Sequence, residues 1–387
     1  MRSVSVIGVG LSKFGERWDA SFRQLVAEAG IKALHDSKID GRSVEAVYGG
    51  CMASGRFIGQ EHVGALIVDQ LGLNPIPSAR LEAACASGGV AFRNAYLAIA
   101  SGMHDVVAVG GVEKMTEVSA EDAATALGGA GDQEWELFIG ATFPALYALI
   151  ARKHMREYGT TEEQMAAVAV KNHENGSMNP YAQYQNKITV EAVMNSTMVA
   201  SPLKLFDCSP ITDGAAVAIL CETEKAKKLC EQPIEVIASA QASDTLALAQ
   251  RSSLTELKAT KIAAKHAFEQ AHLKPKDIQL AEVHDCFTIA EILAIEDLGF
   301  FEKGKGGKAT EEGETKLNAG VSINTSGGLK AAGHPVGATG VKQVVEAVWQ
   351  LRGNAVGQRQ VKNAQHALTH NVGGSGATAV VHIFKKA

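Results

Sequence analysis

Strand-like runs of β-branched and small apolar residues alternate with helical patterns along most of this 387-residue chain. The first run is Val4–Val9, and the segment from Ser21 to His35 follows it with apolar residues at helical spacing. Val106–Gly110 is apolar throughout, as expected of a strand that is buried on both faces. The alternation predicts a layered α/β fold. The 39 glycines and the low aromatic content of 5% suit such a fold, because many tight turns join its strands and helices.

The second half of the chain repeats the order of elements found in the first half. In the first half, a predicted strand at Ser78–Ala83 leads into a helix from Ala86 to Ser101. In the second half, the predicted elements are strands at Ile234–Ala238, Gln279–Val283, Ser322–Asn324 and His366–His370, and helices at Thr260–Ala271 and Val341–Arg352. Aligning Cys85 with His334 gives an offset of 334 − 85 = 249 residues and places both at a strand-to-helix turn. We therefore predict a duplicated domain whose two corresponding turns meet across a pseudo-twofold axis.

Predicted domain boundaries follow from this repeat. Residues 1–115 and 211–230 would form the N-terminal half, and residues 231–387 would form the C-terminal half. Within the N-terminal half, at residues 116–210, the alternation weakens, although a polar helix is predicted near Thr161–Glu174. We interpret this segment as an insertion on the first half, either a lid over a ligand or a plain surface elaboration.

Charge and hydropathy argue against several classes of partner. The net charge is −5, and no block of Lys and Arg is long enough to follow a phosphate backbone, so nucleic acid is not an expected partner. The N-terminal residues 1–15 lack the long apolar core of a signal peptide, and no segment approaches the ~18 apolar residues of a membrane span. We expect a soluble, cytoplasmic protein that does not bind a membrane.

Six cysteines are scattered along the chain without a CxxC pair, which gives little support for a metal site or a disulfide framework. Four are interpreted as small buried apolar residues: Cys51, Cys208, Cys221 and Cys230. Cys85 differs because it lies between a predicted strand and a predicted helix, with small neighbours that leave room for a bulky thioester. At this position the positive end of the helix favours a reactive thiolate. The alternative is a buried cysteine in a tight turn.

A second segment, Gly327–Gly340, contains five glycines and one proline in 14 residues, with His334 near its centre. Histidine exchanges protons near neutral pH, so His334 is a candidate acid or base. The segment matches neither of the phosphate-binding patterns GxxxxGK[ST] and GxGxxG. The alternative is a structural histidine that caps a turn.

A third segment places His284, Asp285 and Cys286 at the end of a predicted strand, where open α/β sheets bind their ligands. His284 and Cys286 would point to the same side if the chain is still extended there. A metal site is a weaker alternative, because no further ligand pair accompanies them. Near the C-terminus, His370–Gly376 forms another glycine-rich turn whose backbone amides could serve as an oxyanion hole.

Together, these motifs resemble those of the thiolase superfamily. The resemblance rests on Cys85 in Ala-Cys-Ala-Ser-Gly, on His334 in Gly-His-Pro-Val-Gly-Ala-Thr-Gly and on the His284–Phe287 block, and it covers essentially the whole chain. The pattern departs from that of most thiolases in two places. His-Asp-Cys-Phe replaces Asn-Glu-Ala-Phe, and Asn371 replaces the second catalytic cysteine of the final glycine-rich turn. A thiol absent from one loop is therefore present in the neighbouring one.

This exchange is similar to the pattern of sterol-carrier-protein-type thiolases and archaeal acetoacetyl-CoA thiolases. We expect no sterol-carrier domain after Ala377, which favours the archaeal, biosynthetic group. The resemblance implies a duplicated, five-layered αβαβα thiolase fold with an inserted loop domain. It implies an acetyl-CoA C-acetyltransferase that condenses two acetyl-CoA to acetoacetyl-CoA and CoA by ping-pong chemistry, feeding HMG-CoA and mevalonate synthesis. CoA thioesters would be the substrates, and neither a prosthetic group nor a metal is expected.

The resemblance also implies roles for individual residues. Cys85 would attack the thioester while His334 accepts its proton. Cys286 would then remove a proton from the second acetyl-CoA, and His284 and His334 would donate hydrogen bonds to the enolate oxygen. The backbone N–H groups of Cys85 and Gly373 are implied as an oxyanion hole. The substrate pocket is expected to include Phe287, Asn324 and Asn371.

Two alternatives stay open at this stage. One is a degradative 3-ketoacyl-CoA thiolase that acts on longer acyl chains, and the other is a thiolase-fold scaffold that binds acyl-CoA within a complex without turnover. The combination of Cys85, His284, Cys286 and His334 argues against the scaffold. The resemblance further implies a homodimer or tetramer, and association with HMG-CoA synthase through a small zinc-ribbon and OB-fold bridging protein.

Overall fold

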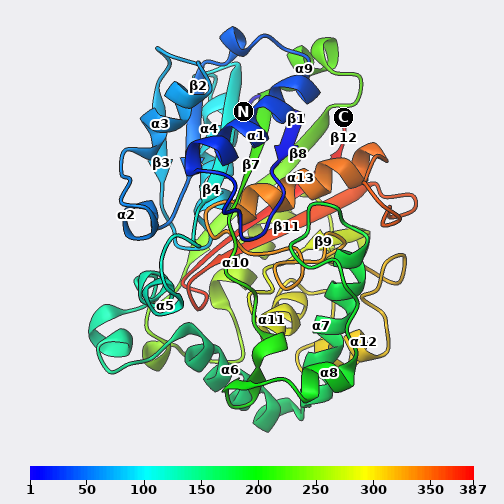
Figure 1. Ribbon diagram of the computed structural model, residues 1–387. Coiled ribbons are helices and arrows are strands. Elements are labelled where there is room, and N and C mark those ends of the chain that lie inside the picture. Colours follow the sequence, from blue (N-terminus) through cyan, green and yellow to red (C-terminus); the bar gives the residue numbers. More distant parts are fainter.

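The computed structural model describes all 387 residues, and a mixed ten-stranded sheet runs through the molecule (Figure 1). The strand order is β10-β9-β11-β12-β8-β1-β7-β4-β2-β3. These strands are β1 (Val4–Leu11), β2 (Ala46–Gly50), β3 (Ser78–Leu81), β4 (Val106–Glu113), β7 (Gly214–Glu222), β8 (Ile234–Ser243), β9 (Leu280–Glu282), β10 (Ser322–Ile323), β11 (His366–Gly373) and β12 (Thr378–Lys386).

The sheet consists of two half-sheets with the same topology. The N-terminal half-sheet has the order β1-β7-β4-β2-β3, and the C-terminal half-sheet has the corresponding order β8-β12-β11-β9-β10. In each, the first three strands pair antiparallel and the last three pair parallel. β1 and β8 join the halves through two residue pairs, Ser5 with Glu235 and Val6 with Ile234. The duplication predicted from the sequence is therefore confirmed.

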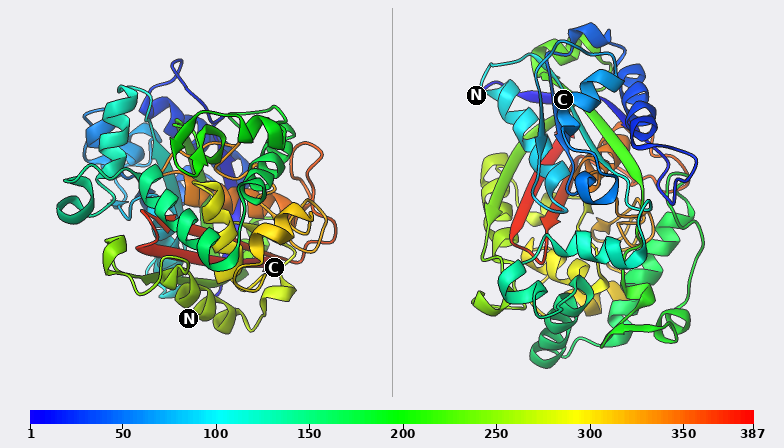
Figure 2. Two further views of the ribbon diagram at one scale, coloured as in Figure 1. Left: turned by 90° about the horizontal axis from the view of Figure 1, so that it is seen from below. Right: turned by 60° about the vertical axis from the view of Figure 1, so that its left-hand side comes forward.

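Helices form three layers around the two half-sheets. Helices α4 (Ser87–Ala100) and α13 (Thr339–Arg352) pack against each other and against strands of both halves, so they form the middle layer. Helix α1 (Phe22–Ser37) covers the outer face of the N-terminal half-sheet, and α10 (Lys258–Ala271) covers that of the C-terminal half-sheet (Figure 2). The remaining helices of the two halves are α2 (Ser54–Phe57), α3 (Val63–Gln70), α9 (Thr223–Leu229), α11 (Thr288–Asp297) and α12 (Gly306–Glu311). This is the five-layered arrangement that the resemblance implied.

The packing of β1 illustrates how the sequence sets these layers. Val6 and Val9 belong to the largest buried cluster, which includes α4 and α13, whereas Ile7 belongs to the cluster that contains α1. Helix α1 approaches the strand closely because Gly10 has no side chain. A Cβ atom at Gly10 would lie 2.1 Å from the carbonyl oxygen of Ala29. The two faces of one strand thus form two different cores, and a register shift between Val6 and Gly8 brings Val6 and Val9 to the same face.

Residues 116–210 form a largely helical region against the C-terminal half, at the lower end of the molecule in Figure 1. Its elements are α5 (Ala120–Gly128), α6 (Phe143–Tyr158), α7 (Glu162–Ser177), α8 (Val190–Met194), β5 (Met198–Ala200) and β6 (Leu203–Lys204). The region contains more helix than its weak alternation predicted, because its apolar residues pack on α11 rather than on a sheet. None of the helices in the structure combines the length and apolar character needed to cross a membrane.

Candidate active site

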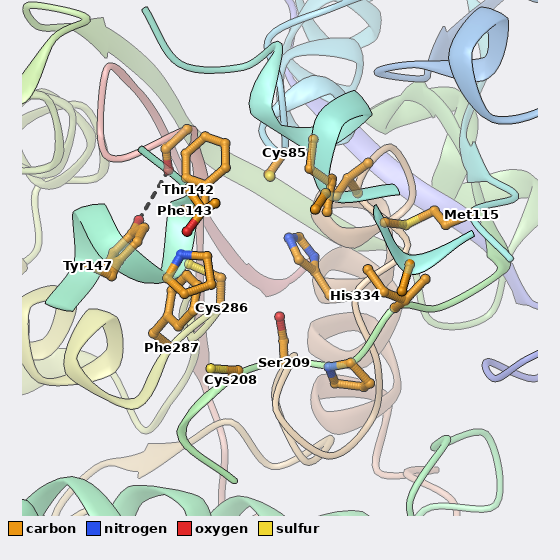
Figure 3. A pocket seen from close by; sticks show the side chains of 18 residues that line it. Cys85, Met115, Thr142, Phe143, Tyr147, Cys208, Ser209, Cys286, Phe287 and His334 are labelled. Atoms are coloured by element: carbon orange, nitrogen blue, oxygen red, sulfur yellow. Dashed lines mark hydrogen bonds between the residues drawn. The ribbon is translucent and has the colours of Figure 1, made fainter. Parts of the chain in front are cut away.

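Three segments that are distant in sequence meet at a cavity of about 200 Å³. Cys85 lies in the turn between β3 and α4, His334 in the turn between β10 and α13, and Cys286 between β9 and α11. Figure 3 shows the three side chains around this cavity, and 12 of its 18 lining residues are hydrophobic. A charge that develops inside the cavity is therefore poorly solvated by water, and nearby hydrogen-bond donors gain importance.

Cys85 lies on a sharp turn. Ala84, the preceding residue, has a φ of 52°, a left-handed conformation that is uncommon for a residue with a side chain. Ser87 holds this turn, because its hydroxyl donates to the Ala84 carbonyl at 2.6 Å and accepts from the Ala83 N–H at 2.9 Å. Helix α4 begins at Ser87 and has no side-chain cap, so Cys85 lies at the positive end of the helix as predicted.

Glycines bring the two strand-to-helix turns together. A Cβ atom at Gly88 would lie 2.7 Å from the Gly337 carbonyl oxygen, and one at Gly340 would lie 2.2 Å from the Gly89 nitrogen. The beginnings of α4 and α13 therefore touch through backbone atoms. This contact explains why both motifs are rich in glycine, and it places Cys85 and His334, from the two halves of the duplication, in one site.

The hydrogen bonds of His334 determine which ring nitrogen carries its proton. Its Nδ1 lies 2.7 Å from the Thr339 hydroxyl, and that hydroxyl donates its own hydrogen to the Pro335 carbonyl at 3.0 Å. Since the hydroxyl has one hydrogen, it accepts from Nδ1–H of the neutral ring. The Nε2 atom then carries a lone pair, and this buried atom has no partner in the protein. His334 is therefore a proton acceptor aimed into the site.

His284 has the opposite arrangement. The Asn371 side-chain oxygen accepts from the Gly89 N–H at 3.1 Å, so its NH₂ group faces the Cys85 carbonyl at 3.0 Å and His284 Nδ1 at 3.3 Å. Nδ1 of His284 must accept from this NH₂ group, which leaves the proton on Nε2. Nε2 is also buried without a partner. His284 therefore presents a hydrogen-bond donor where His334 presents an acceptor.

Cys85 and the two imidazoles lie close together. The Cys85 sulfur, a ring nitrogen of His284 and a ring nitrogen of His334 are all within 4.8 Å of one another. The two rings meet edge to face, with centroids 5.1 Å apart. A metal ion would need a lone pair from each ligand, but Asn371 keeps the free nitrogen of His284 protonated. The cluster is therefore better suited to proton transfer and to hydrogen bonding of an oxyanion than to metal binding.

Burial sets the resting protonation states of this cluster. It raises the pKa of the Cys85 thiol to about 12, although the Gly374 N–H opposes the shift by donating to the sulfur. Burial, with a contribution from Lys342, lowers the pKa of His334 to about 3. The helix end was expected to favour the thiolate, but loss of water has the larger effect. The resting pair at neutral pH is therefore a thiol beside a neutral base.

Cys286 is 6% exposed and lines the same cavity. The chain bends at Cys286 after β9, and neighbouring contacts hold it there: Phe287 forms an isolated bridge with Cys208, and the Ser209 N–H donates to the Cys286 carbonyl at 2.9 Å. Burial raises the pKa of the Cys286 thiol well above its ordinary value. Helix α11 begins at Thr288 without a side-chain cap, so unpaired backbone N–H groups lie near this sulfur. Cys286 is thus a protonated thiol whose anion would have donors close by.

Buried carboxylates hold the loops of the site in place. Asp285 accepts from the N–H groups of Leu329 at 2.7 Å and Lys330 at 3.1 Å, which ties the segment after β9 to the glycine-rich loop. Glu113, at the end of β4, accepts from the Gly337 N–H at 3.1 Å on the other side of that loop. Sequence reasoning missed both roles. A carboxylate within or directly after a fully apolar strand is the signal that could have found them.

Other predicted site residues have different positions. Phe287 lines the cavity, but Asn324 does not, because it is buried and its side chain pairs with the Val283 N–H and with Glu291. Asn371 lies behind the cavity wall, where it orients His284. The second predicted backbone donor was Gly373. Gly373 does not line the cavity, whereas Gly374, the next residue in the same turn, does.

Known proteins with similar sequences and structures identify the family. Residues 4–224 match the family model described as thiolase, N-terminal domain, and residues 240–386 match that described as thiolase C-terminal domain-like. An acetyl-CoA acetyltransferase from Methanothermobacter thermautotrophicus is 57% identical over 386 residues, which cover 100% of both chains. Sterol carrier protein 2 from Gallus gallus is 35% identical over 98% of this chain and 71% of its own. A solved structure titled "Ltp2-ChsH2(DUF35) aldolase" has a TM-score of 0.86 at 25% identity, covering 98% of this chain and 97% of that one.

The chain therefore belongs to the thiolase family, and the likeness to its archaeal and sterol-carrier-protein-type members is confirmed. It is an enzyme of the acyltransferase class. The matched regions span both halves of the duplicated sheet, so the fold class predicted from the sequence is confirmed as well. Thiolases act on CoA thioesters, which suits a cavity lined by the thiols of Cys85 and Cys286 and the imidazole base of His334. The imidazole donor, His284, does not line the cavity itself, but its ring nitrogen lies within 4.8 Å of the Cys85 sulfur.

Proposed function

We propose that this enzyme is an acetyl-CoA C-acetyltransferase that condenses two acetyl-CoA molecules to acetoacetyl-CoA and CoA. The full-length identity of 57% to an archaeal acetyl-CoA acetyltransferase supports the substrate. The observation that carries the chemistry is the opposite tautomers of His334 and His284 beside Cys85, one a proton acceptor and the other a donor. The high pKa of the Cys85 thiol makes a partner base necessary for attack.

The first half-reaction is acyl transfer to Cys85. Nε2 of His334 takes the thiol proton as the Cys85 sulfur attacks the thioester carbonyl, and the carbonyl oxygen becomes an oxyanion. Backbone amides at Cys85 and in the turn of Gly373 and Gly374 would stabilise this charge; loss of one such donor typically costs ~100- to 1000-fold in rate. The C–S bond to CoA then breaks, and His334 returns the proton to the departing CoA sulfur. The enzyme holds an acetyl thioester on Cys85.

The second half-reaction forms the carbon–carbon bond. Cys286 gives its proton to His334, and the Cys286 thiolate removes a proton from the methyl group of the second acetyl-CoA. The Nε2–H group of His284 and the protonated His334 donate to the enolate oxygen. The enolate carbon attacks acetyl-Cys85, the bond to the Cys85 sulfur breaks, and His334 returns its proton to that sulfur. Every group ends in its starting protonation state.

A degradative thiolase for longer acyl chains is the second candidate, because the largely apolar cavity wall would also suit a longer acyl chain. We infer that residues 116–210 act as a lid between the two halves, because Thr142, Phe143 and Tyr147 of this segment line the cavity. We further propose that the enzyme forms a homodimer or tetramer, that a bridging protein joins it to HMG-CoA synthase, and that its product supplies mevalonate synthesis.

A substrate panel tests the proposed function. Purified enzyme would be assayed for condensation of acetyl-CoA and for CoA-dependent cleavage of 3-ketoacyl-CoA thioesters of increasing chain length, alone and beside HMG-CoA synthase. We expect kcat/KM to be highest for acetoacetyl-CoA and to fall with chain length, and condensation to be measurable when the synthase consumes the product. A higher kcat/KM for long-chain substrates would support the degradative alternative instead.

A further inference from the structure

Tyr147 on α6 comes from the inserted region, and sequence motifs gave no reason to select it. Its side chain is 1% exposed and lines the cavity together with Cys85 and Cys286. Its ring packs on that of Phe287, with centroids 4.6 Å apart, and its hydroxyl donates to the Gly374 carbonyl at 3.1 Å. Figure 3 shows Tyr147 among the residues around the cavity, with its hydroxyl pointing along this hydrogen bond.

The Cys286 thiolate would need hydrogen-bond donors besides the backbone N–H groups at the start of α11. The thiol is surrounded by an apolar cluster that includes Tyr147, Phe287 and Ile289. Under the proposed function it must become a thiolate, and its proton must go to His334, a weak base. Each hydrogen bond to the sulfur anion therefore lowers the energy of the state that removes the substrate proton.

We infer that Tyr147 is a positioning residue for the condensation step, whose hydroxyl turns from the Gly374 carbonyl to the Cys286 sulfur when that sulfur loses its proton. This inference rests on the proposed function and extends it to the inserted region. No atom is transferred by Tyr147. Its O–H bond stays intact, and one hydrogen bond replaces another.

The charges around the two groups agree with this role. Burial and the neighbouring Cys286 and Cys85 raise the pKa of Tyr147 well above its ordinary value, so the phenol remains a donor throughout the neutral range. Tyr147 in turn acts to lower the pKa of the Cys286 thiol against the larger effect of burial. A purely structural role is the competing explanation, since the same hydroxyl anchors the turn that carries the Gly374 amide.

The test compares Tyr147→Phe with Tyr158→Phe, which removes a hydroxyl from a 41% exposed tyrosine on the same helix. Acyl transfer is measured as exchange of labelled CoA into acetyl-CoA, and condensation is measured separately with a coupled assay. We expect Tyr147→Phe to lower kcat of condensation by about 10- to 100-fold, the range for loss of a hydrogen bond to a charged group. Its exchange rate should stay within about threefold of wild type, and Tyr158→Phe should change neither rate.

The pH profile gives a readout that a structural role would not move. In the wild-type enzyme, the condensation rate should rise with pH. In Tyr147→Phe, this rise should occur at a higher pH. Equal losses of the exchange rate and the condensation rate would overturn the inference, because they would indicate that Tyr147 only anchors the Gly374 turn. An unchanged condensation rate would overturn it too.

If the Tyr147→Phe variant does not fold, an enzyme with 3,5-difluorotyrosine at position 147 is tested instead. The pH profile of its condensation rate should shift to lower pH. An unshifted profile would overturn the inference. Failure of the proposed function would be visible separately, because the wild-type enzyme would then exchange CoA without forming acetoacetyl-CoA.

Discussion

Replacing Thr339 by valine removes the hydroxyl that fixes the proton of His334 on Nδ1 and keeps the shape of the side chain. Nδ1–H would then be buried without an acceptor, because its neighbour in the native structure is the Thr339 hydroxyl at 2.7 Å. Leaving one buried donor unsatisfied costs about 1–3 kcal/mol. The ring can avoid this cost by carrying its proton on Nε2, where it no longer accepts the Cys85 proton.

The expected consequence is a slower acylation step. If the tautomer equilibrium shifts by about 1–3 kcal/mol, the rate of CoA exchange into acetyl-CoA should fall roughly 5- to 150-fold. Thr339→Ser is the matched control, since it retains the hydroxyl and should remain within a few-fold of wild type. Thermal unfolding of both variants separates loss of activity from loss of fold. An exchange rate in Thr339→Val equal to that of Thr339→Ser would refute the tautomer argument.

Three further perturbations test the same geometry. Gly340→Ala should lower both the melting temperature, measured by calorimetry, and the activity, because its Cβ would lie 2.2 Å from the Gly89 nitrogen. The control Gly320→Ala, whose Cβ would have its nearest neighbour at 3.5 Å, should leave the melting temperature nearly unchanged. Asn371→Leu should reduce condensation by about tenfold or more in the coupled assay, since His284 loses the donor that keeps its proton on Nε2; full condensation activity would contradict that assignment. Acid should destabilise the fold. The buried His334, His370 and His382 have pKa values of about 3, so below pH ~6.5 the unfolded chain takes up protons that the folded chain does not. The free energy of unfolding should then fall by up to ~1.4 kcal/mol per pH unit for each histidine. Urea titrations that give the same free energy of unfolding at pH 7.5 and at pH 5 would contradict this prediction.

Much of the fold could be predicted from the sequence because each predicted element carries a strong local signal. Helix α1 has a capping box at Ser21 and an apolar face, and α13 ends at Gly353, whose φ is 77°. The duplicated order of strands and helices follows from the same periodicities. Strands β2, β7 and β12 were not recognised. β2 (Ala46–Gly50) contains too few residues for periodicity to separate it from a loop, whereas β7 and β12, of nine residues each, were overlooked.

The motifs predicted which residues to consider, but not how they are oriented. The tautomers of His284 and His334 depend on Asn371 and Thr339, and the contact that fixes His284 joins residues separated by 87 positions. The resting protonation of Cys85 also differed from expectation, because the helix end is a local feature whereas burial depends on the whole fold. Tyr147 had no sequence signal, since a tyrosine on an amphipathic helix usually belongs to the core.

Mass spectrometry of the acyl-enzyme tests the central claim that the two thiols divide the chemistry between them. Wild-type enzyme and Cys286→Ala would each be mixed with acetyl-CoA, quenched, digested and analysed for acetylated peptides. We predict that Cys286→Ala accumulates acetyl groups on the peptide that contains Cys85 while forming no acetoacetyl-CoA. Acetylation of Cys286 in the wild-type enzyme, or condensation at the wild-type rate by Cys286→Ala, would contradict the account.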